Sequence, residues 1–177
     1  MLLCAGALIV STEPAMQRHP AESPRVVLDT NACLALFAYA DPSCATLLAA
    51  LREGRVQAVA NLATRTEWLQ VLARDALKLD DNRRSRAVQL FDALVTTIGT
   101  DPAAARAAVS LPRCRDRDDQ MFLELTRDAG AVALYTRDRE LLRLSRRTQR
   151  LAGFVVRPPE DCDCSSEVHV ALMPNMC

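Results

Sequence analysis

Short apolar runs alternate with longer amphipathic segments along most of this 177-residue chain. Runs rich in valine, leucine and alanine that end in polar residues are typical of parallel strands, which are buried on both faces of their sheet. The predicted strands are, in chain order, 26–28, 56–60, a weaker candidate at 96–100, 131–136 and a short run within 154–161. This alternation predicts βαβ units and an α/β fold with a mostly parallel sheet of four to five strands.

Capping residues and glycines indicate where the helices begin and end. Asp41 and Pro42 begin a helix that runs to about Gly54, because aspartate is a favoured N-cap and proline a favoured first residue. The other predicted helices are 32–40, 62–77, 80–95, 116–130 and 137–147. We find no repeat and no interior linker, so residues 25–160 are predicted to form one domain.

The two ends of the chain depart from this pattern. Residues 1–24 begin with an apolar stretch that is shorter than the roughly 20 residues of a membrane span and lacks the positive start of a signal peptide. We expect a disordered leader there, with Met16 as an alternative start and a short secretory signal as the competing interpretation. Residues 161–177 are expected to be a disordered tail, because Cys162, Cys164 and His169 are too few and too irregularly spaced for a zinc finger.

Composition restricts the interpretation only a little. Half of the residues are hydrophobic, and 22 basic side chains balance 22 acidic ones. A net charge of zero does not by itself demand a nucleic-acid partner, so the distribution of charge has to carry that argument. Seven cysteines without a CxxC pair favour reduced thiols and a cytoplasmic protein.

Two predicted strands are each followed by an aspartate. Asp29 comes directly after the first strand, and Asp138 follows the strand 131–136 by two residues. Parallel strands place their carboxyl ends at one edge of the sheet, where open α/β proteins bind ligands. Aspartate is also an ordinary helix cap, so both a functional and a capping interpretation stay open.

Asp119 is distinguished by the helix face on which it lies. At helical spacing it shares a stripe with Phe122, Leu123 and Thr126, so its carboxylate is directed towards the core. A buried charge needs a partner, a raised pKa or a metal ion. The alternative is that the aspartates of this segment only favour the helix N-terminus through its dipole.

Glu67 has the weakest case from its pattern alone. The main apolar face of its predicted helix is formed by Leu62, Leu69, Leu72 and Ala76, nearly opposite the glutamate. The helical wheel therefore favours a solvated side chain.

Taken together, five segments resemble a known family. They are VVLDTN (26–31), TEWLQVL (66–72), RCRDRDDQMFLEL (113–125), ALYTRDRELLRL (133–144) and FVVRPPED (154–161). In this order they resemble the PIN domain, named for the PilT N-terminus, and most of all its bacterial group that includes toxins of toxin-antitoxin pairs. The likeness covers about residues 25–160.

The resemblance implies a three-layer α/β/α fold and a cytoplasmic ribonuclease that uses one or two Mg²⁺ or Mn²⁺ ions to cut single-stranded RNA. It carries the catalytic, metal-binding acids onto Asp29, Glu67, Asp119 and Asp138. Asn31, Asp116 and Thr136 are expected to support these ligands. The partners expected are RNA, an antitoxin protein and a second copy of the chain in a homodimer, with no membrane.

The chemistry agrees with these residue types. Mg²⁺ prefers carboxylate and water oxygens and needs no histidine, and a two-metal site would clamp the attacking and leaving oxygens of a phosphodiester. We expect Arg115, Arg139 and Arg143 to bind RNA. Two groups of arginines motivate this: one stripe of Arg139, Arg143, Arg146 and Arg150, and three that flank the third acid, Arg113, Arg115 and Arg117. Such stripes are also ordinary solvated faces.

Several other classes fit the sequence less well. A phosphoacceptor receiver needs a lysine late in the fold, whereas the only lysine is Lys78 on a middle helix. A haloacid-dehalogenase-type phosphatase would need an aspartate where Asn31 stands, and the chain has no P-loop motif. The serious alternative is a non-catalytic PIN-like module that binds RNA or protein and whose acids are structural.

Overall fold

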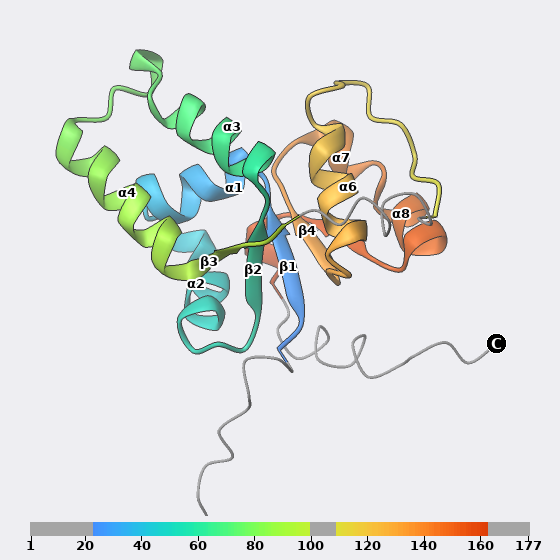
Figure 1. Ribbon diagram of the computed structural model, residues 1–177. Helices are drawn as coiled ribbons and strands as arrows, with labels where there is room; N and C mark the ends of the chain where they lie inside the picture. The colour runs from blue at the N-terminus through green and yellow to red at the C-terminus, as the bar shows by residue number, and fades with distance from the viewer. Residues whose placement is uncertain (1–22, 100–108, 163–177) are drawn as a thin grey trace, which may run out of the picture.

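The computed structural model describes residues 23–99 and 109–162 (Figure 1). Its centre is a sheet of five strands, all parallel, in the order β3-β2-β1-β4-β5. The strands are β1 (Arg25–Leu28), β2 (Gln57–Ala60), β3 (Val95–Thr97), β4 (Ala133–Tyr135) and β5 (Val155–Arg157). The predicted mostly parallel sheet of four to five strands is thereby confirmed.

Helices cover both faces of this sheet. They are α1 (Thr30–Cys33), which continues as a π-helix (Leu34–Ala38), α2 (Ala45–Arg52), α3 (Leu62–Leu72), α4 (Asp81–Leu94), α6 (Gln120–Asp128), α7 (Arg139–Leu142) and α8 (Ser145–Ala152). Short 3-10 turns occupy Pro42–Cys44, Asp75–Leu77 and Pro159–Asp161. Helices α1 to α4 lie on one side of the sheet and α6 to α8 on the other, so the fold has three layers (Figure 1).

Alternation along the strands produces two separate hydrophobic cores. In β1, Val26 and Leu28 belong to the core beneath α1 to α4, whereas Val27 belongs to the core beneath α6 and α7. Strand β4 divides in the same way, because Tyr135 faces the first core and Leu134 the second. Burial on both faces explains why these strands are continuous apolar runs in the sequence.

Several predicted helix boundaries are wrong. The helix expected over 62–77 ends at Leu72, and the helix expected from Asp116 begins only at Gln120. The helix expected over 137–147 is interrupted, and α8 begins at Ser145. The Ser145 hydroxyl accepts a hydrogen bond from the Val156 amide of β5 at 3.0 Å, which ties the start of α8 to the sheet.

Among the described residues, no single helix is long and apolar enough to cross a membrane. Two consecutive helical segments, Thr30–Ala38 and Pro42–Arg52, are together long and apolar enough, but the chain bends by 103° between them. Side chains of both segments, including Phe37 and Leu47, are buried in the first core. Nearly all of the expected leader and tail, with Met16, Cys164 and His169, lies outside the described residues.

Cys33, Cys44 and Cys114 carry free thiols. Burial raises the pKa of the Cys33 thiol well above its usual range, and the neighbouring carboxylate of Asp29 adds to this effect. A thiol with a raised pKa is protonated and unreactive at neutral pH.

Candidate acidic site at the carboxyl ends of the strands

Asp29 lies at the point where the strand order of the sheet reverses. It follows β1, which has β2 on one side and β4 on the other, and open α/β sheets bind ligands at this switch point. The residue is 3% exposed, and its amide donates to the carbonyl of Tyr135 at 3.0 Å. Its carboxylate accepts hydrogen bonds from the Ala32 amide at 2.6 Å and from the Thr136 hydroxyl. Asp29 therefore caps α1 and also joins the end of β1 to the end of β4.

The pKa of Asp29 is raised to about 6, chiefly because burial removes water from the carboxylate. Hydrogen bonds from Thr136 and Ala32 act in the opposite direction. The charges of Asp119 and Asp138 raise this pKa further. Three acids from three separate segments of the chain are thus close enough to repel one another.

Thr136 connects two of these acids. It is fully buried, and its hydroxyl donates to Asp29 while it accepts from the amide of Asp138 at 2.9 Å. One carboxylate oxygen of Asp138 accepts from the amides of Glu140 at 2.6 Å and Leu141 at 3.1 Å, and thereby caps α7. Within the described part of the chain, its other oxygen makes no hydrogen bond, so one oxygen of Asp138 is left for a ligand.

Asp119 differs from the other two aspartates. It stands at the N-cap position of α6, yet its side chain makes no capping hydrogen bond. Phe122, Leu123 and Thr126 on the same stripe are buried, as the helical spacing predicts. Partial burial, followed by the charges of the nearby Asp116, Asp138 and Glu67, raises the pKa of Asp119 to about 6. Capping therefore does not explain why an acid occupies this position.

Glu67 does not face open solvent, contrary to the helical-wheel prediction. Leu62, which the wheel placed on the buried face of α3, is 75% exposed, whereas Trp68 is 1% exposed and fixes the orientation of the helix. The Trp68 ring stacks on Phe91 with centroids 5.7 Å apart. Glu67 is consequently half-buried on the side of α3 that faces α6.

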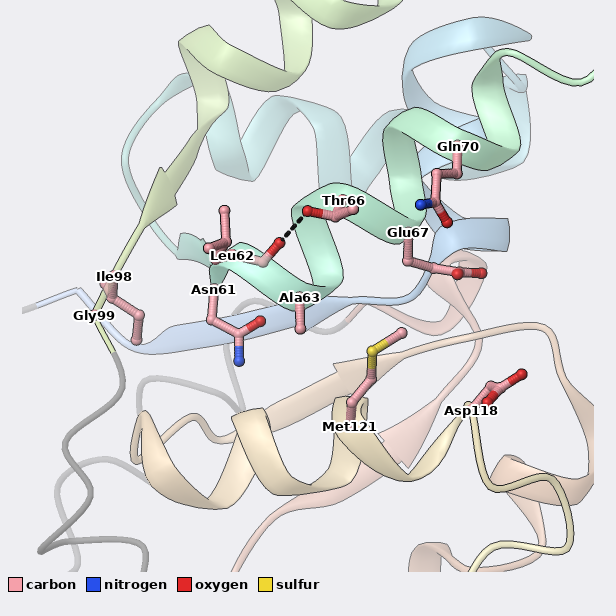
Figure 2. A pocket seen from close by; sticks show the side chains of 10 residues that line it. All are labelled: Asn61, Leu62, Ala63, Thr66, Glu67, Gln70, Ile98, Gly99, Asp118 and Met121. Carbon is pink, nitrogen blue, oxygen red and sulfur yellow. Dashed lines mark hydrogen bonds between the residues drawn. The ribbon is translucent and has the colours of Figure 1, made fainter.

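Glu67 lines a pocket of about 720 Å³. Figure 2 shows this side chain on α3, facing the start of α6. Asp118 and Met121 line the opposite wall of the pocket. Because the charge of Glu67 raises the pKa of Asp119, the glutamate belongs electrostatically to the same group of acids.

A second pocket, of about 670 Å³, contains Asp119 and Asp138 themselves. Asp116 and Arg115 also line it, and the Asp116 carboxylate accepts from the Asp118 amide at 3.0 Å. The other expected supporting and RNA-binding residues lie outside this lining. Asn31 and Arg139 are exposed, and the exposed Arg143 is paired with Glu140 at 2.5 Å.

The arginine stripe predicted for 139–150 is not continuous. Arg139 belongs to α7 and Arg143 caps its end, whereas Arg146 and Arg150 belong to α8. The prediction assumed one uninterrupted helix, and the docking of Ser145 on β5 breaks it.

The donor set suits a hard divalent cation in chemical type, since it consists of carboxylate oxygens. In residues 23–99 and 109–162, however, no three acidic, histidine or cysteine side chains are grouped closely enough to form a ready ligand cage. Mg²⁺ keeps several water ligands and often binds through one or two carboxylates together with substrate phosphate. The arrangement fits that mode of binding and does not fit a site built entirely of protein ligands.

Arg137, which no pattern in the sequence singled out, lies between Thr136 and Asp138. Its guanidinium donates to Asp41 and to the Ser43 hydroxyl, both at 2.8 Å, and to Glu160 at 3.3 Å. The hydrogen bonds from Ser43 and Arg137 lower the pKa of Asp41 to about 2. These contacts tie the loop that carries Asp138 to two 3-10 turns. Its only signal in the sequence was its place between the two site residues.

The chain belongs to the PIN-domain family, because the profile of that family matches residues 25–140, more than half of the sequence. None of the curated proteins matches the chain. Two solved structures are similar in fold. VapBC2 from Rickettsia felis, bound to a DNA fragment of its promoter, is 10% identical over 75% of this chain and 96% of that chain, with a TM-score of 0.49. PAE2754 from Pyrobaculum aerophilum is 17% identical over 88% and 100%, with a TM-score of 0.48.

Proposed function

We propose that this protein is a divalent-metal-dependent endoribonuclease that hydrolyses phosphodiester bonds in single-stranded RNA. Membership of the PIN-domain family supports a nuclease. The observation that carries the proposal is the closeness of Asp29, Asp119 and Asp138 beyond the carboxyl ends of β1 and β4. The charges of Asp119 and Asp138 raise the pKa of Asp29, and the charge of Asp138 also raises the pKa of Asp119. Natural proteins rarely place several partly buried carboxylates together unless a cation or a reaction requires them.

Each residue has a role in this proposal. Asp29, Glu67, Asp119 and Asp138 would hold one or two Mg²⁺ or Mn²⁺ ions through carboxylate and water oxygens. A bound ion would supply charge neutralisation at the scissile phosphate and a more acidic water. Thr136 orients Asp29 by donating its hydroxyl hydrogen, and Asp116 adds negative charge at the mouth of the pocket. Arg115 lines the same pocket and would contact the RNA backbone.

The competing function is a PIN-like module that binds RNA or protein without cutting. The capping bonds made by Asp29 and Asp138 agree with it, because they give both acids a structural task. The absence of such a bond at Asp119 favours the nuclease.

A cleavage assay on labelled single-stranded RNA tests the proposal. We expect cleavage with manganese or magnesium and loss of it with EDTA. Asp29→Asn should lose about a hundredfold or more, the size of effect that removal of one electrostatic group has in other active sites. Asp81→Asn is the matched control, since the Asp81 side chain is 99% exposed on α4. Cleavage that survives EDTA or the Asp29 substitution would show another mechanism or a contaminant.

We further propose that the protein acts in the cytoplasm as the toxin of a toxin-antitoxin pair and forms a homodimer. The likeness of its motifs to the bacterial toxin group supports this finer assignment. Growth arrest on expression, relieved by the product of a directly adjacent small reading frame, would test the toxin role. Light scattering at increasing protein concentration would test the dimer.

A further inference from the structure

A third pocket, with three arginines among its eight lining residues, adjoins the acidic site. It has a volume of about 600 Å³, and its lining includes Arg113, Arg117, Gln120, Glu124 and Arg127. It lies between α6 and the loop that precedes this helix. The proposed reaction does not use Arg113, Arg117 or Arg127. Arg113 and Arg117 flank Asp119 in the sequence but are not among the three arginines predicted to bind RNA.

The walls of this pocket are fixed by hydrogen bonds. Gln120 accepts from the amide of Cys114 at 2.8 Å and donates to the carbonyl of Pro112 at 3.5 Å. Arg127, the last residue but one of α6, donates to the carbonyl of Val109 at 3.2 Å. The described part of the loop is thus held against α6 at Val109 and again at Pro112 and Cys114, so hydrogen bonds fix the shape of the pocket.

The pocket carries an excess of positive charge. Arg127 is paired with Asp128 at 2.7 Å, and Glu124 is an acid on the lining. Within the described segments, Arg113 and Arg117 have no acidic partner within ion-pair distance. Arg143, by contrast, is neutralised by Glu140. Free guanidinium groups at the wall of a pocket are suited to oxyanions, because their planar donors match a phosphate.

This third pocket adjoins the pocket that contains Asp119 and Asp138, because Arg117 lines both. We propose that Arg113 and Arg117 bind the phosphates of single-stranded RNA next to the scissile one, so that the strand leaves the acidic site along α6. This inference rests on the proposed function for the position of the scissile phosphate. The pocket lining contains no aromatic side chain. Contact with the backbone is therefore expected, with little preference among bases.

An acidic segment of a partner protein is the competing occupant. We favour RNA because the arginines continue directly from the place where a phosphodiester must sit. A peptide site would be expected to offer apolar anchors, and of the residues that line this pocket only Leu111 and Cys114 are apolar.

The test is the salt dependence of RNA binding, measured in EDTA so that no cleavage occurs. A short fluorescein-labelled oligouridine is titrated with the wild type, with Arg113→Gln/Arg117→Gln and with Arg86→Gln. Arg86 is an exposed arginine of α4, on the other side of the sheet, and serves as the matched control. All three substituted arginines are exposed, so the variants should fold, and melting curves are the check.

Each lost phosphate contact should reduce the slope of log K against log salt by about 0.7. The double variant should therefore bind about tenfold or more weakly at low salt with a slope smaller by about 1.4, while Arg86→Gln leaves both unchanged. Unchanged affinity and slope in the double variant would overturn the inference. So would loss of binding to a polyglutamate peptide with RNA affinity intact, which would identify a protein-docking surface.

A separate cleavage assay on the wild type keeps the two proposals apart. Wild type that binds RNA but never cuts it would refute the ribonuclease, whereas the salt slope still decides the assignment of the two arginines. Wild type that cuts RNA while the double variant retains the full slope would refute this inference alone.

Discussion

At the scale of single residues, the acids of the site repel one another, and the fold holds them close together despite this repulsion. Asp29 and Asp119 both have a pKa of about 6, compared with 3.8 for an unperturbed aspartate. An acid whose pKa is raised by folding binds its proton more tightly in the native state. The native state is therefore favoured below the raised pKa, and this stability is lost as the pH rises from about 4 to about 6.

Asp119→Asn should make the metal-free protein more stable at pH 7. The substitution removes one repelling charge and no capping hydrogen bond, and we expect a gain on the order of 1 kcal/mol, reduced by solvent screening of the half-buried group. The loss of stability between about pH 4 and 6 should also be shallower than in the wild type. Urea unfolding in EDTA at a series of pH values measures both effects.

Asp81→Asn provides the comparison, because it removes an exposed acid from the first turn of α4 and should bring no such gain. A destabilised Asp119→Asn protein would mean that the aspartate is a structural cap or ion-pair partner. Asp41 does not affect the change in stability that is measured between about pH 4 and 6. Because its pKa is lowered to about 2, its stabilising contribution is constant between about pH 4 and 6 and is lost only at lower pH.

At the scale of elements, one hydroxyl joins two strand ends and a helix. Thr136 follows β4, donates to the aspartate that follows β1, and accepts from the amide of the residue that caps α7. Arg137 holds the same loop from outside through Asp41 and Glu160. The position of Asp138 relative to Asp29 therefore depends on this loop and not on either helix alone.

Thr136→Val should destabilise the protein by about 2 kcal/mol, because it leaves a buried carboxylate oxygen and a backbone amide without partners. The cost should be larger at pH 7 than at pH 4, since the Thr136 hydrogen bond favours the charged form of Asp29. Thr136→Ser keeps the hydroxyl and should recover most of the loss. Destabilisation by serine with none by valine would instead point to packing of the threonine methyl group, which valine keeps and serine lacks.

At the scale of the whole molecule, metal binding should stabilise the fold. A ligand that binds only the native state adds RT ln(1 + [L]/Kd), about 2.7 kcal/mol at a hundredfold excess over Kd. For a domain of this size, that corresponds to a rise in Tm of roughly 5 to 10 °C. Thermal melting with manganese and with EDTA measures the shift.

Asp29→Asn should lose most of this shift, because Asp29 is buried and directly follows β1, the middle strand of the sheet. Asp81→Asn should retain it. A metal-induced rise in Tm of the same size in Asp29→Asn would place the bound ion elsewhere on the molecule.

The sequence by itself determined the layers of the fold and the placement of three of the acids. Strands buried on both faces must be apolar at every position, so runs such as Val26 to Leu28 are visible without any tertiary information. Parallel pairing then places Asp29 and Asp138 at one edge of the sheet, whatever the details of packing. The helical spacing around Asp119 likewise fixed the direction of its carboxylate, because Phe122 and Leu123 could only face the core.

Only the tertiary structure decided the remaining features. The orientation of α3 depends on where the large Trp68 ring finds aromatic partners, and not on a count of leucines, so Leu62 is exposed and Glu67 turns towards α6. The break before α8 depends on a hydrogen bond from Val156, and the role of Arg137 depends on acids up to 96 residues away. These outcomes are set by contacts between distant segments, and a local periodicity carries no information about such contacts.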